Sequence, residues 1–292
     1  MKKNYSLMYL LAALALSALV SCSDDDKSGD EYKVYENHIS LEGEDNLRDL
    51  GGYVGQDGKR VLYRKLFRSG ELSALTESDK TTLSDIGIEQ VFDLRSEVES
   101  KDQADNLPTS VELIHFPLSG DASGNEGGDS ELSYEEQMKL FMQKLASGEI
   151  SVDDVMAKTY IADSLKVAQW RKIFDKLETG KASLWHCTAG KDRAGMTTLL
   201  ILSSLGVSEE SCIDDFLKSN DYLADYIKTY KAQLTEAYGT EAAEAIIPLM
   251  GVKRSWIEAF IKDVKTKYGS IAAFLEELGV DTIQMQENYL ER

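Results

Sequence analysis

Positive charge is scarce in this sequence. Its 292 residues include 32 lysines and arginines against 51 aspartates and glutamates, which gives a formal net charge of −19. Such a chain repels nucleic acids and anionic membrane surfaces at long range, so nucleic acid is not an expected partner. Any anionic substrate would need a locally positive pocket.

Long hydrophobic runs are absent after residue 21, and a composition of 42% hydrophobic and 28% charged residues is ordinary for a soluble globular protein. The N-terminus differs, because Lys2 and Lys3 precede an apolar run from Leu7 to Val20. A membrane-spanning helix needs about 20 apolar residues, so this run is too short to predict a span. It predicts a secretory signal peptide over residues 1–21.

Cysteine is rare as well, and the first of the 3 cysteines follows the apolar run directly. Leu19-Val20-Ser21-Cys22 resembles the lipobox of bacterial lipoproteins, in which the chain is cut before a cysteine that is then lipidated. We therefore expect an exported bacterial lipoprotein, anchored through Cys22 on the periplasmic face or at the cell surface. Residues 22–39 predict an acidic, flexible tether, and residues 40–292 a single catalytic domain. The alternative is an ordinary signal peptide with an incidental cysteine.

The other two cysteines are Cys187 and Cys212. A disulfide between them is possible in an exported protein, although Cys212 lies in an expected helix and fits better as a small buried residue. A zinc site at His186 and Cys187 is not expected, because adjacent residues at the end of a strand diverge. The sequence also contains no second Cys/His pair.

Strands and helices alternate in the first two thirds of the chain. Strands are expected at 61–67, 88–93, 111–116 and 182–186. Helices are expected from an N-cap at Thr76 to Gly87, at 134–147, twice within 151–178, from 193 to Gly206, and several times within 208–290. The Gly- and Ser-rich residues 119–133 predict a mobile loop. The fold class is therefore α/β, with a mainly parallel sheet flanked by helices, a helical insertion that could form a lid, and a helical C-terminal half.

The most informative segment is His-Cys-Thr-Ala-Gly-Lys-Asp-Arg-Ala-Gly at residues 186–195. A strand ends at Cys187, a tight loop follows, and a helix begins near Arg193. Successive loop N–H groups can then converge on one anion, and the helix N-terminus adds partial positive charge. Gly190 allows the backbone to fold closely around the ligand. The residues expected to bind phosphate are Thr188, Ala189, Gly190, Lys191, Asp192 and Arg193.

This arrangement indicates phosphoryl chemistry at a thiol. A helix N-terminus and neighbouring cations favour the thiolate, which is the reactive form of cysteine. The guanidinium of Arg193 can hold two phosphate oxygens at once. The expected reaction is in-line attack by the sulfur of Cys187, followed by hydrolysis of the phosphocysteine. A nucleotide-binding P-loop is excluded, because Trp185 and Asp192 stand where that motif needs Gly and Ser or Thr.

Residues 186–195 resemble the signature of the cysteine-dependent protein tyrosine phosphatase superfamily. The Gly-Lys-Asp-Arg form is similar to an atypical bacterial branch that includes secreted tyrosine and phosphoinositide phosphatases. Three further segments match that branch in order: Asn-Leu-Arg-Asp-Leu-Gly-Gly at 46–52, Phe-Arg-Ser-Gly at 67–70 and Phe-Asp-Leu-Arg-Ser at 92–96. The resemblance covers roughly residues 40–290. It implies a phosphatase fold, no metal and no organic cofactor, and activity on phosphotyrosine, sometimes on phosphoserine or phosphothreonine, and often on phosphoinositides.

The resemblance also implies roles for individual residues. Cys187 is the nucleophile, Arg193 the phosphate ligand, and Lys191 an additional positive charge. Asp93 is the favoured general acid, and its alternative is a structural carboxylate paired with Arg95 or Arg68. Asp192 could share the acid's task. Asp121 is a third candidate for the acid, His186 an orienting partner, and Asn46, Arg48, Asp49 and Arg68 are expected to brace the site.

One position departs from the superfamily pattern. Ala194 stands where a serine or threonine hydroxyl usually helps the thiolate leave during hydrolysis of the intermediate. We therefore predict slow dephosphorylation of the intermediate, unless Thr188 or Thr197 supplies the hydroxyl.

Three other functions stay open at this point. The same chemistry could act on inositol polyphosphates, as in phytase-like enzymes. A sulfurtransferase of the rhodanese type also uses a cysteine in an anion-binding loop. The third possibility is a lipoprotein that binds a phosphate ligand without catalysis. The leading hypothesis is hydrolysis of phosphotyrosine in a phosphorylated protein.

Overall fold

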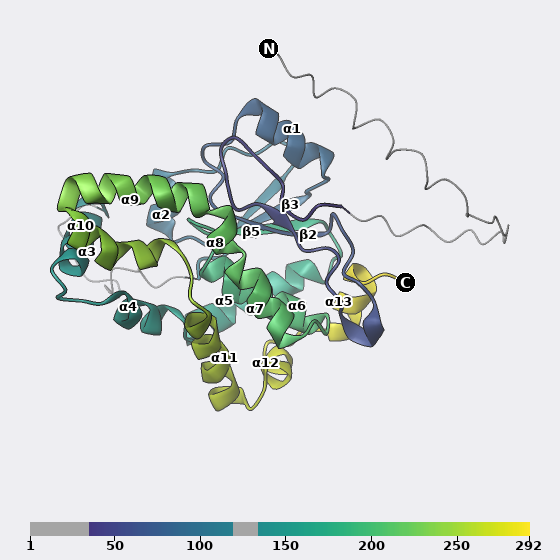
Figure 1. Ribbon diagram of the computed structural model, residues 1–292. Coiled ribbons are helices and arrows are strands. Elements are labelled where there is room, and N and C mark those ends of the chain that lie inside the picture. The colour runs from purple at the N-terminus through teal and green to yellow at the C-terminus, as the bar shows by residue number, and fades with distance from the viewer. Residues whose placement is uncertain (1–34, 119–133) are drawn as a thin grey trace, which may run out of the picture. The chain divides into compact units, whose positions relative to one another are not determined.

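The computed structural model describes residues 35–118 and 134–292 (Figure 1). The chain divides into two units, residues 1–32 and 33–292, and only the second is described. The predicted signal peptide, Cys22, most of the tether, and the loop at 119–133 with Asp121 lie outside the described residues. Within the described ranges, no helix is both long and apolar enough to cross a membrane.

A five-stranded sheet forms the centre of the second unit, in the order β1-β2-β5-β3-β4. Its strands are β1 (Arg48–Asp49), β2 (Leu66–Ser69), β3 (Gln90–Asp93), β4 (Glu112–His115) and β5 (Ser183–His186). Only the short β1 runs antiparallel to its neighbour; the other pairings are parallel. This confirms the predicted mainly parallel sheet. The register sets Ser69 and Asp93 beside His186, so β2, β3 and β5 end together at one edge.

Helices cover the sheet and make up most of the C-terminal half, as predicted. Their bounds are α1 Glu77–Asp85, α2 Glu97–Asp102, α3 Tyr134–Ala146, α4 Val152–Thr159, α5 Ser164–Leu177, α6 Arg193–Ser204, α7 Glu209–Leu217, α8 Ser219–Tyr222, α9 Ala224–Tyr238, α10 Thr240–Ile246, α11 Arg254–Tyr268, α12 Ile271–Glu277 and α13 Thr282–Tyr289, with short 3-10 helices at Gln56–Gly58 and Ile247–Met250.

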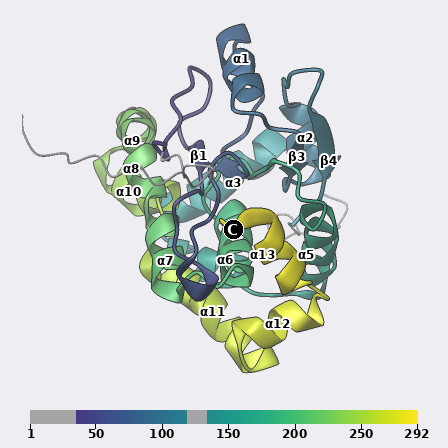
Figure 2. The same ribbon diagram turned by 90° about the vertical axis from the view of Figure 1, so that its right-hand side faces the viewer.

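The two faces of the sheet carry separate hydrophobic clusters. Successive side chains of a strand point to opposite faces, so Leu184 of β5 packs in the smaller cluster with Leu83 of α1. Its neighbour Trp185 packs in the larger cluster with α5, α6 and α7. Helix α1 lies on one side of the sheet and α5, α6 and α7 on the other (Figure 1). Helices α6 and α13 lie side by side (Figure 2). The larger cluster therefore packs α6, whose first residue is Arg193, against β2 and β5.

Local sequence signals account for both ends of α1. Thr76 and Asp79 form a capping box at the start of α1, and Gly87 follows its end with a φ of 81°. The expected pair of helices within 151–178 is present as α4 and α5. The inserted helix α3 packs against α10, and α4 packs against α11. The lid role of the insertion stays a prediction.

The strand predicted at 61–67 is wrong for residues 61–65. Val61 forms only an isolated bridge with Leu290, and the strand itself begins at Leu66, because Arg64 adopts a φ of 61°, which interrupts extended backbone. The N–H of Arg64 donates instead to Oδ2 of Asp49, at 2.6 Å. Asp49 and Arg48 form β1, a strand that the sequence did not predict.

Candidate active site

The candidate site is the loop of residues 187–193, called here the catalytic loop, at the edge where β2, β3 and β5 end. It begins with Cys187, whose residue is only 2% exposed, directly after β5. Cys187 and Cys212 are both free thiols, so the possible disulfide between them is not formed. Burial raises the pKa of Cys212 to about 12, which makes that thiol unreactive.

The carbonyl groups of the catalytic loop are hydrogen-bonded to the surrounding frame. The N–H of Glu71 donates to the carbonyl of Thr188 at 2.9 Å, and Nδ2 of Asn46 donates to that of Ala189 at 2.9 Å. A trans peptide directs its N–H opposite to its carbonyl. The N–H groups that follow these carbonyls therefore point away from the frame, as an anion-binding nest requires.

Arg68 holds the next two carbonyl groups of the loop. Its Nη2 donates to the carbonyl of Gly190 at 2.7 Å and to that of Lys191 at 3.2 Å. Gly190 has a φ of 68°, and a Cβ there would lie 2.2 Å from the carbonyl oxygen of Ser69. No side chain fits in that space. The close approach between loop and β2 is therefore the reason for glycine at this position.

A buried carboxylate fixes Arg68 in turn. Nη1 of Arg68 lies 2.7 Å from Oδ2 of Asp215 on α7, and Nε of Arg48 lies 2.9 Å from Oδ1. Burial alone would raise the pKa of Asp215, but the charges of Arg48 and Arg68 lower it to about 2. Of the predicted bracing residues, Asn46 and Arg68 thus contact the loop directly. Arg48 acts through Asn46 and Asp215, and Asp215 was not predicted.

Asp49 braces a different part of the structure. Its carboxylate accepts from the N–H of Gly51 at 2.8 Å and from that of Arg64. It therefore fixes the turn between β1 and β2 rather than the catalytic loop.

Arg193 opens α6 and forms a two-pronged ion pair with Glu99 of α2. Nη1 and Nη2 of Arg193 each lie 2.8 Å from a carboxylate oxygen of Glu99. The hydroxyl of Thr188 also donates to Glu99, at 2.6 Å. Burial works against the charge, but the hydrogen bonds from Arg193 and Thr188 hold the pKa of Glu99 well below its usual range. Glu99 therefore stays ionised and sets the orientation of the guanidinium.

Glu99 was not identified from the sequence. The available signal was the Ser96-x-x-Glu99 pattern, which forms a capping box at the start of α2. That pattern predicts where the helix begins. It does not reveal a partner 94 residues later in the chain.

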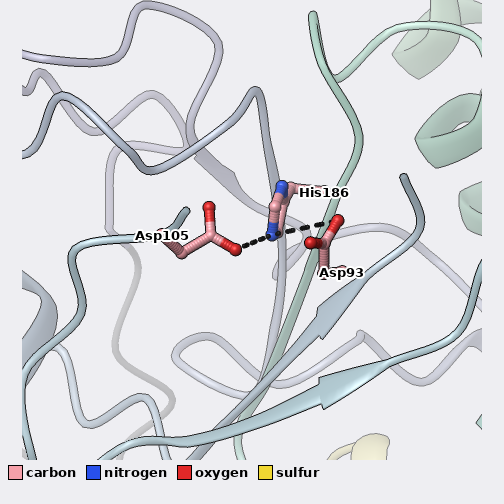
Figure 3. Close-up of side chains that lie close together, drawn as sticks. All are labelled: Asp93, Asp105 and His186. Atoms are coloured by element: carbon pink, nitrogen blue, oxygen red, sulfur yellow. Dashed lines mark ion pairs between the residues drawn. The ribbon is translucent and has the colours of Figure 1, made fainter. Parts of the chain in front are cut away.

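Asp93, the favoured general acid, lies in a buried cluster with Asp105 and His186 (Figure 3). Nε of Arg95 lies 2.9 Å from Oδ1 of Asp93, and the hydroxyl of Ser100 donates to Oδ2 at 2.6 Å. Burial alone would raise the pKa of Asp93, but the hydrogen bonds from Arg95, the charge of His186 and the bond from Ser100 lower it to about 2. An ionised carboxylate has no proton to donate, so this geometry favours the structural alternative. The general-acid role of Asp93 stays a prediction.

The same cluster could in principle hold a metal ion, since Asp93, Asp105 and His186 each offer a ligand atom within 4.8 Å of the others. Nε2 of His186 lies 3.1 Å from Oδ2 of Asp105, a distance that suits an ion pair, although the two atoms make no hydrogen bond of good geometry. Arg95 contacts both carboxylates and already supplies a cation there. The two carboxylates are therefore better explained as partners of Arg95 than as ligands of a metal ion.

Asp192 is the other candidate acid within the described residues, and its carboxylate is more accessible than that of Asp93. Its side chain is 20% exposed, against 4% for Asp93. Nζ of Lys191 donates to Oδ2 of Asp192 at 2.5 Å, and the hydroxyl of Tyr160 donates to Oδ1 at 2.6 Å. The position of Asp192, next to Arg193 and at the N-terminus of α6, suits a group that meets a leaving oxygen.

Both hydroxyls proposed to replace the one missing at Ala194 already make hydrogen bonds in this structure. The hydroxyl of Thr188 donates to Glu99. That of Thr197 donates to the carbonyl of Arg193 at 2.9 Å and accepts from Nε1 of Trp170 at 3.0 Å. Slow dephosphorylation therefore stays a prediction.

The Ala194→Ser variant is expected to turn over faster than the wild type, because the new hydroxyl can donate to the departing sulfur. One added hydrogen bond to a charged group is worth roughly 10-fold in rate. Pre-steady-state kinetics with an aryl phosphate should show a smaller burst and a faster steady state. If the burst and the turnover both match the wild type, release of the thiolate does not limit the reaction.

Glu44 lies behind the catalytic loop and connects it to β2. Its Oε1 accepts from the N–H of Gly70 at 2.5 Å and from that of Asn46 at 2.8 Å, and Asn46 in turn binds the carbonyl of Ala189. Burial raises the pKa of Glu44 from 4.5 to about 7. The side chain therefore keeps its proton in mildly acidic solution.

This shift predicts a pH-dependent stability that Glu44→Gln removes. Between pH 4.5 and 7 the folded protein holds a proton that the unfolded chain releases, so the stabilising effect is complete below that range and is lost as the pH rises through it. At about 1.4 kcal/mol per pKa unit, the wild type should lose up to about 3 kcal/mol relative to Glu44→Gln. Urea unfolding across this range measures the difference. Glu42→Gln, at an exposed position, is the control, and parallel curves for wild type and Glu44→Gln would refute the assignment.

A loop of this construction suits the transfer of a phosphoryl group to a cysteine, and it places the protein among the cysteine-dependent phosphatases. The sequence agrees with this class. The sequence model of the tyrosine phosphatase family matches residues 39–291, so the chain belongs to that family. The resemblance noted in the sequence is thereby confirmed.

Similar proteins carry related names. A Cupriavidus necator protein, provisionally named a tyrosine-protein phosphatase, is 29% identical over 84% of this chain and 85% of its own length. The triple specificity protein phosphatase PtpB of Mycobacterium tuberculosis is 26% identical over 82% of this chain and 93% of its own length. Among solved structures, a kinase associated phosphatase is 15% identical, with a TM-score of 0.31, and covers 57% of this chain and 87% of its own.

Proposed function

We propose that this protein hydrolyses phosphate monoesters, phosphotyrosine above all, through a phosphocysteine at residue 187. One observation carries the proposal: the loop carbonyls are bonded outward by Asn46, Arg68 and the N–H of Glu71, which directs the N–H groups of these peptides toward the opposite side, where an anion can bind. Membership in the tyrosine phosphatase family supports the phosphotyrosine assignment. The name of the relative PtpB, a triple specificity protein phosphatase, supports a range of substrates wider than phosphotyrosine.

The first chemical step forms a bond between Sγ of Cys187 and phosphorus while the bond from phosphorus to the ester oxygen breaks. The electron pair of the broken bond goes to the leaving oxygen, which takes a proton from a carboxylic acid, with Asp192 and Asp93 as the candidates. Arg193 and the loop N–H groups stabilise the charge on the phosphoryl oxygens.

In the second step, a water molecule attacks phosphorus and loses a proton to the same carboxylate. The bond from sulfur to phosphorus breaks, and inorganic phosphate and the thiolate of Cys187 are released. No metal and no organic cofactor takes part in this proposal.

We also propose that the mature protein is an exported lipoprotein held in the membrane through Cys22. Lys2, Lys3 and the short apolar run before Cys22 support this assignment. Mass spectrometry of the native N-terminal peptide tests it. The expected finding is acyl chains on Cys22, and a free thiol there in a chain cleaved elsewhere contradicts the anchor.

The activity is tested by phosphate release from tyrosine, serine and threonine phosphopeptides, phosphoinositides and inositol polyphosphates. Wild type and the variants Cys187→Ser and Cys212→Ser are compared. The proposal expects fast release from phosphotyrosine peptides by wild type and Cys212→Ser, and none by Cys187→Ser. Preference for inositol polyphosphates over peptides would overturn the substrate assignment. Binding without release by the wild type would show a phosphate-binding protein instead.

A further inference from the structure

Tyr160 is a buried polar group close to the catalytic loop that the mechanism has not used. It lies between α4 and α5, 27 positions before Cys187 in the chain, and is only 1% exposed. Its ring packs edge-on against the ring of Phe216, with 6.0 Å between ring centroids, and at a tilt against Trp256, with 6.2 Å between centroids. These contacts come from α7 and α11, so the ring is fixed by two separate helices.

The hydroxyl of Tyr160 makes one short contact with the site, a 2.6 Å hydrogen bond to Oδ1 of Asp192. Asp192 is the N-cap residue of α6, but its side chain makes no capping hydrogen bond to the helix. Its carboxylate is instead held by two side chains, because Nζ of Lys191 donates to Oδ2 at 2.5 Å. The carboxylate of Asp192 is therefore held by Tyr160 and Lys191, and not by the backbone N–H groups of α6.

We propose that Tyr160 is a positioning residue, which holds Asp192 so that Oδ2 delivers the proton to the leaving oxygen. The inference rests on the proposed phosphatase function and assigns the acid to Asp192 rather than Asp93. As the ester bond breaks, the proton moves from Oδ2 of Asp192 to the leaving oxygen. The resulting carboxylate then takes a proton from the water that attacks the phosphocysteine. The Tyr160 proton stays on its own oxygen throughout.

The groups around Tyr160 and Asp192 suit a phenol that positions the acid and a carboxyl group that donates the proton. Burial raises the pKa of Tyr160 well above its ordinary value, so the phenol remains a hydrogen-bond donor. Oδ1 of Asp192 is thereby occupied by a neutral donor. Oδ2 accepts from Lys191, whose ammonium is attracted to an incoming phosphate, and once the ammonium turns to that phosphate Oδ2 can carry the proton. In contrast, the guanidinium of Arg95 is bonded to both oxygens of Asp93 and does not release them.

Tyr160→Phe tests the proposal, because it removes the hydroxyl and keeps the ring contacts with Phe216 and Trp256. The measurement is kcat/KM over a series of aryl phosphates whose leaving groups differ in basicity. We expect a loss of roughly 10- to 100-fold for the most basic leaving groups, and little loss for the least basic, which need no proton. Tyr289→Phe, which removes another buried phenol hydroxyl bonded to the carbonyl of Leu177, is the matched control.

The combination with Asp192→Asn separates positioning from a purely structural role. If Tyr160 acts through Asp192, the double variant loses no more activity than Asp192→Asn alone. A uniform loss across all leaving groups in Tyr160→Phe, or fully multiplicative losses in the double variant, overturns the proposal. So does an Asp192→Asn variant that keeps wild-type dependence on the leaving group. The phosphatase function itself fails only if the wild type releases no phosphate or Cys187→Ser retains activity, so the two failures are distinct.

Discussion

The Arg193→Lys variant is expected to lose roughly 10²- to 10³-fold in kcat/KM on aryl phosphates. Nη1 and Nη2 of Arg193 each donate to one carboxylate oxygen of Glu99 at 2.8 Å. This bidentate ion pair fixes the plane in which the guanidinium meets a phosphate. An ammonium is a single point of charge and reproduces neither the fork nor the fixed plane. Most of the loss should appear in kcat, because the charge on the phosphoryl oxygens is best matched in the transition state.

A matched control is available on α5. Arg171 donates to the carbonyl groups of Glu277 and Leu278 at the protein surface, so Arg171→Lys makes the same chemical change away from the loop. It should retain wild-type kinetics. If Arg193→Lys also retains activity within a few-fold, with its thermal unfolding unchanged, the guanidinium does not bind the reacting phosphate.

The Asp215→Asn variant is expected to lose about 3–5 kcal/mol of folding free energy. Asp215 is the carboxylate shared by Arg48 and Arg68, and all three side chains are at most 1% exposed. An amide in its place leaves two buried guanidinium groups without a compensating charge. The same change should loosen the catalytic loop, because Arg68 holds the carbonyls of Gly190 and Lys191.

Urea unfolding, monitored by tryptophan fluorescence, measures this effect. Glu244→Gln removes an ion pair with Lys231 in which both side chains are about half exposed, and it should cost less than about 1 kcal/mol. Equal stabilities for Asp215→Asn and Glu244→Gln would mean that Asp215 does not neutralise the two arginines in the folded protein.

The sequence predicted the features that depend on neighbouring residues. The apolar runs and the capping pattern of Thr76 and Asp79 predicted β3, β5 and α1 closely, because strand periodicity and helix caps are local properties. Cys187 and Arg193 could be placed at one loop for the same reason, since only six positions separate them. The strand at 61–67 failed at Arg64, whose left-handed backbone no residue type announces.

The supporting carboxylates could not be predicted because their partners are remote in the chain. Glu99 binds Arg193 across 94 positions, and Asp215 binds Arg68 across 147. In the sequence both residues look like ordinary acids of helices. Asp93 shows the opposite case: the motif identified it as important, but only its contact with Arg95 distinguishes a structural carboxylate from an acid.

Trapping the phosphoenzyme tests the central claim most directly. Wild type and Cys187→Ser are mixed with an isotopically labelled aryl phosphate, quenched within the first turnover, and digested for mass spectrometry. The account predicts a phosphoryl group on the peptide that carries Cys187, bonded to sulfur, and none on that of Cys187→Ser, which also releases no phosphate. Phosphate release by the wild type with no label on Cys187, or continued turnover by Cys187→Ser, would contradict it.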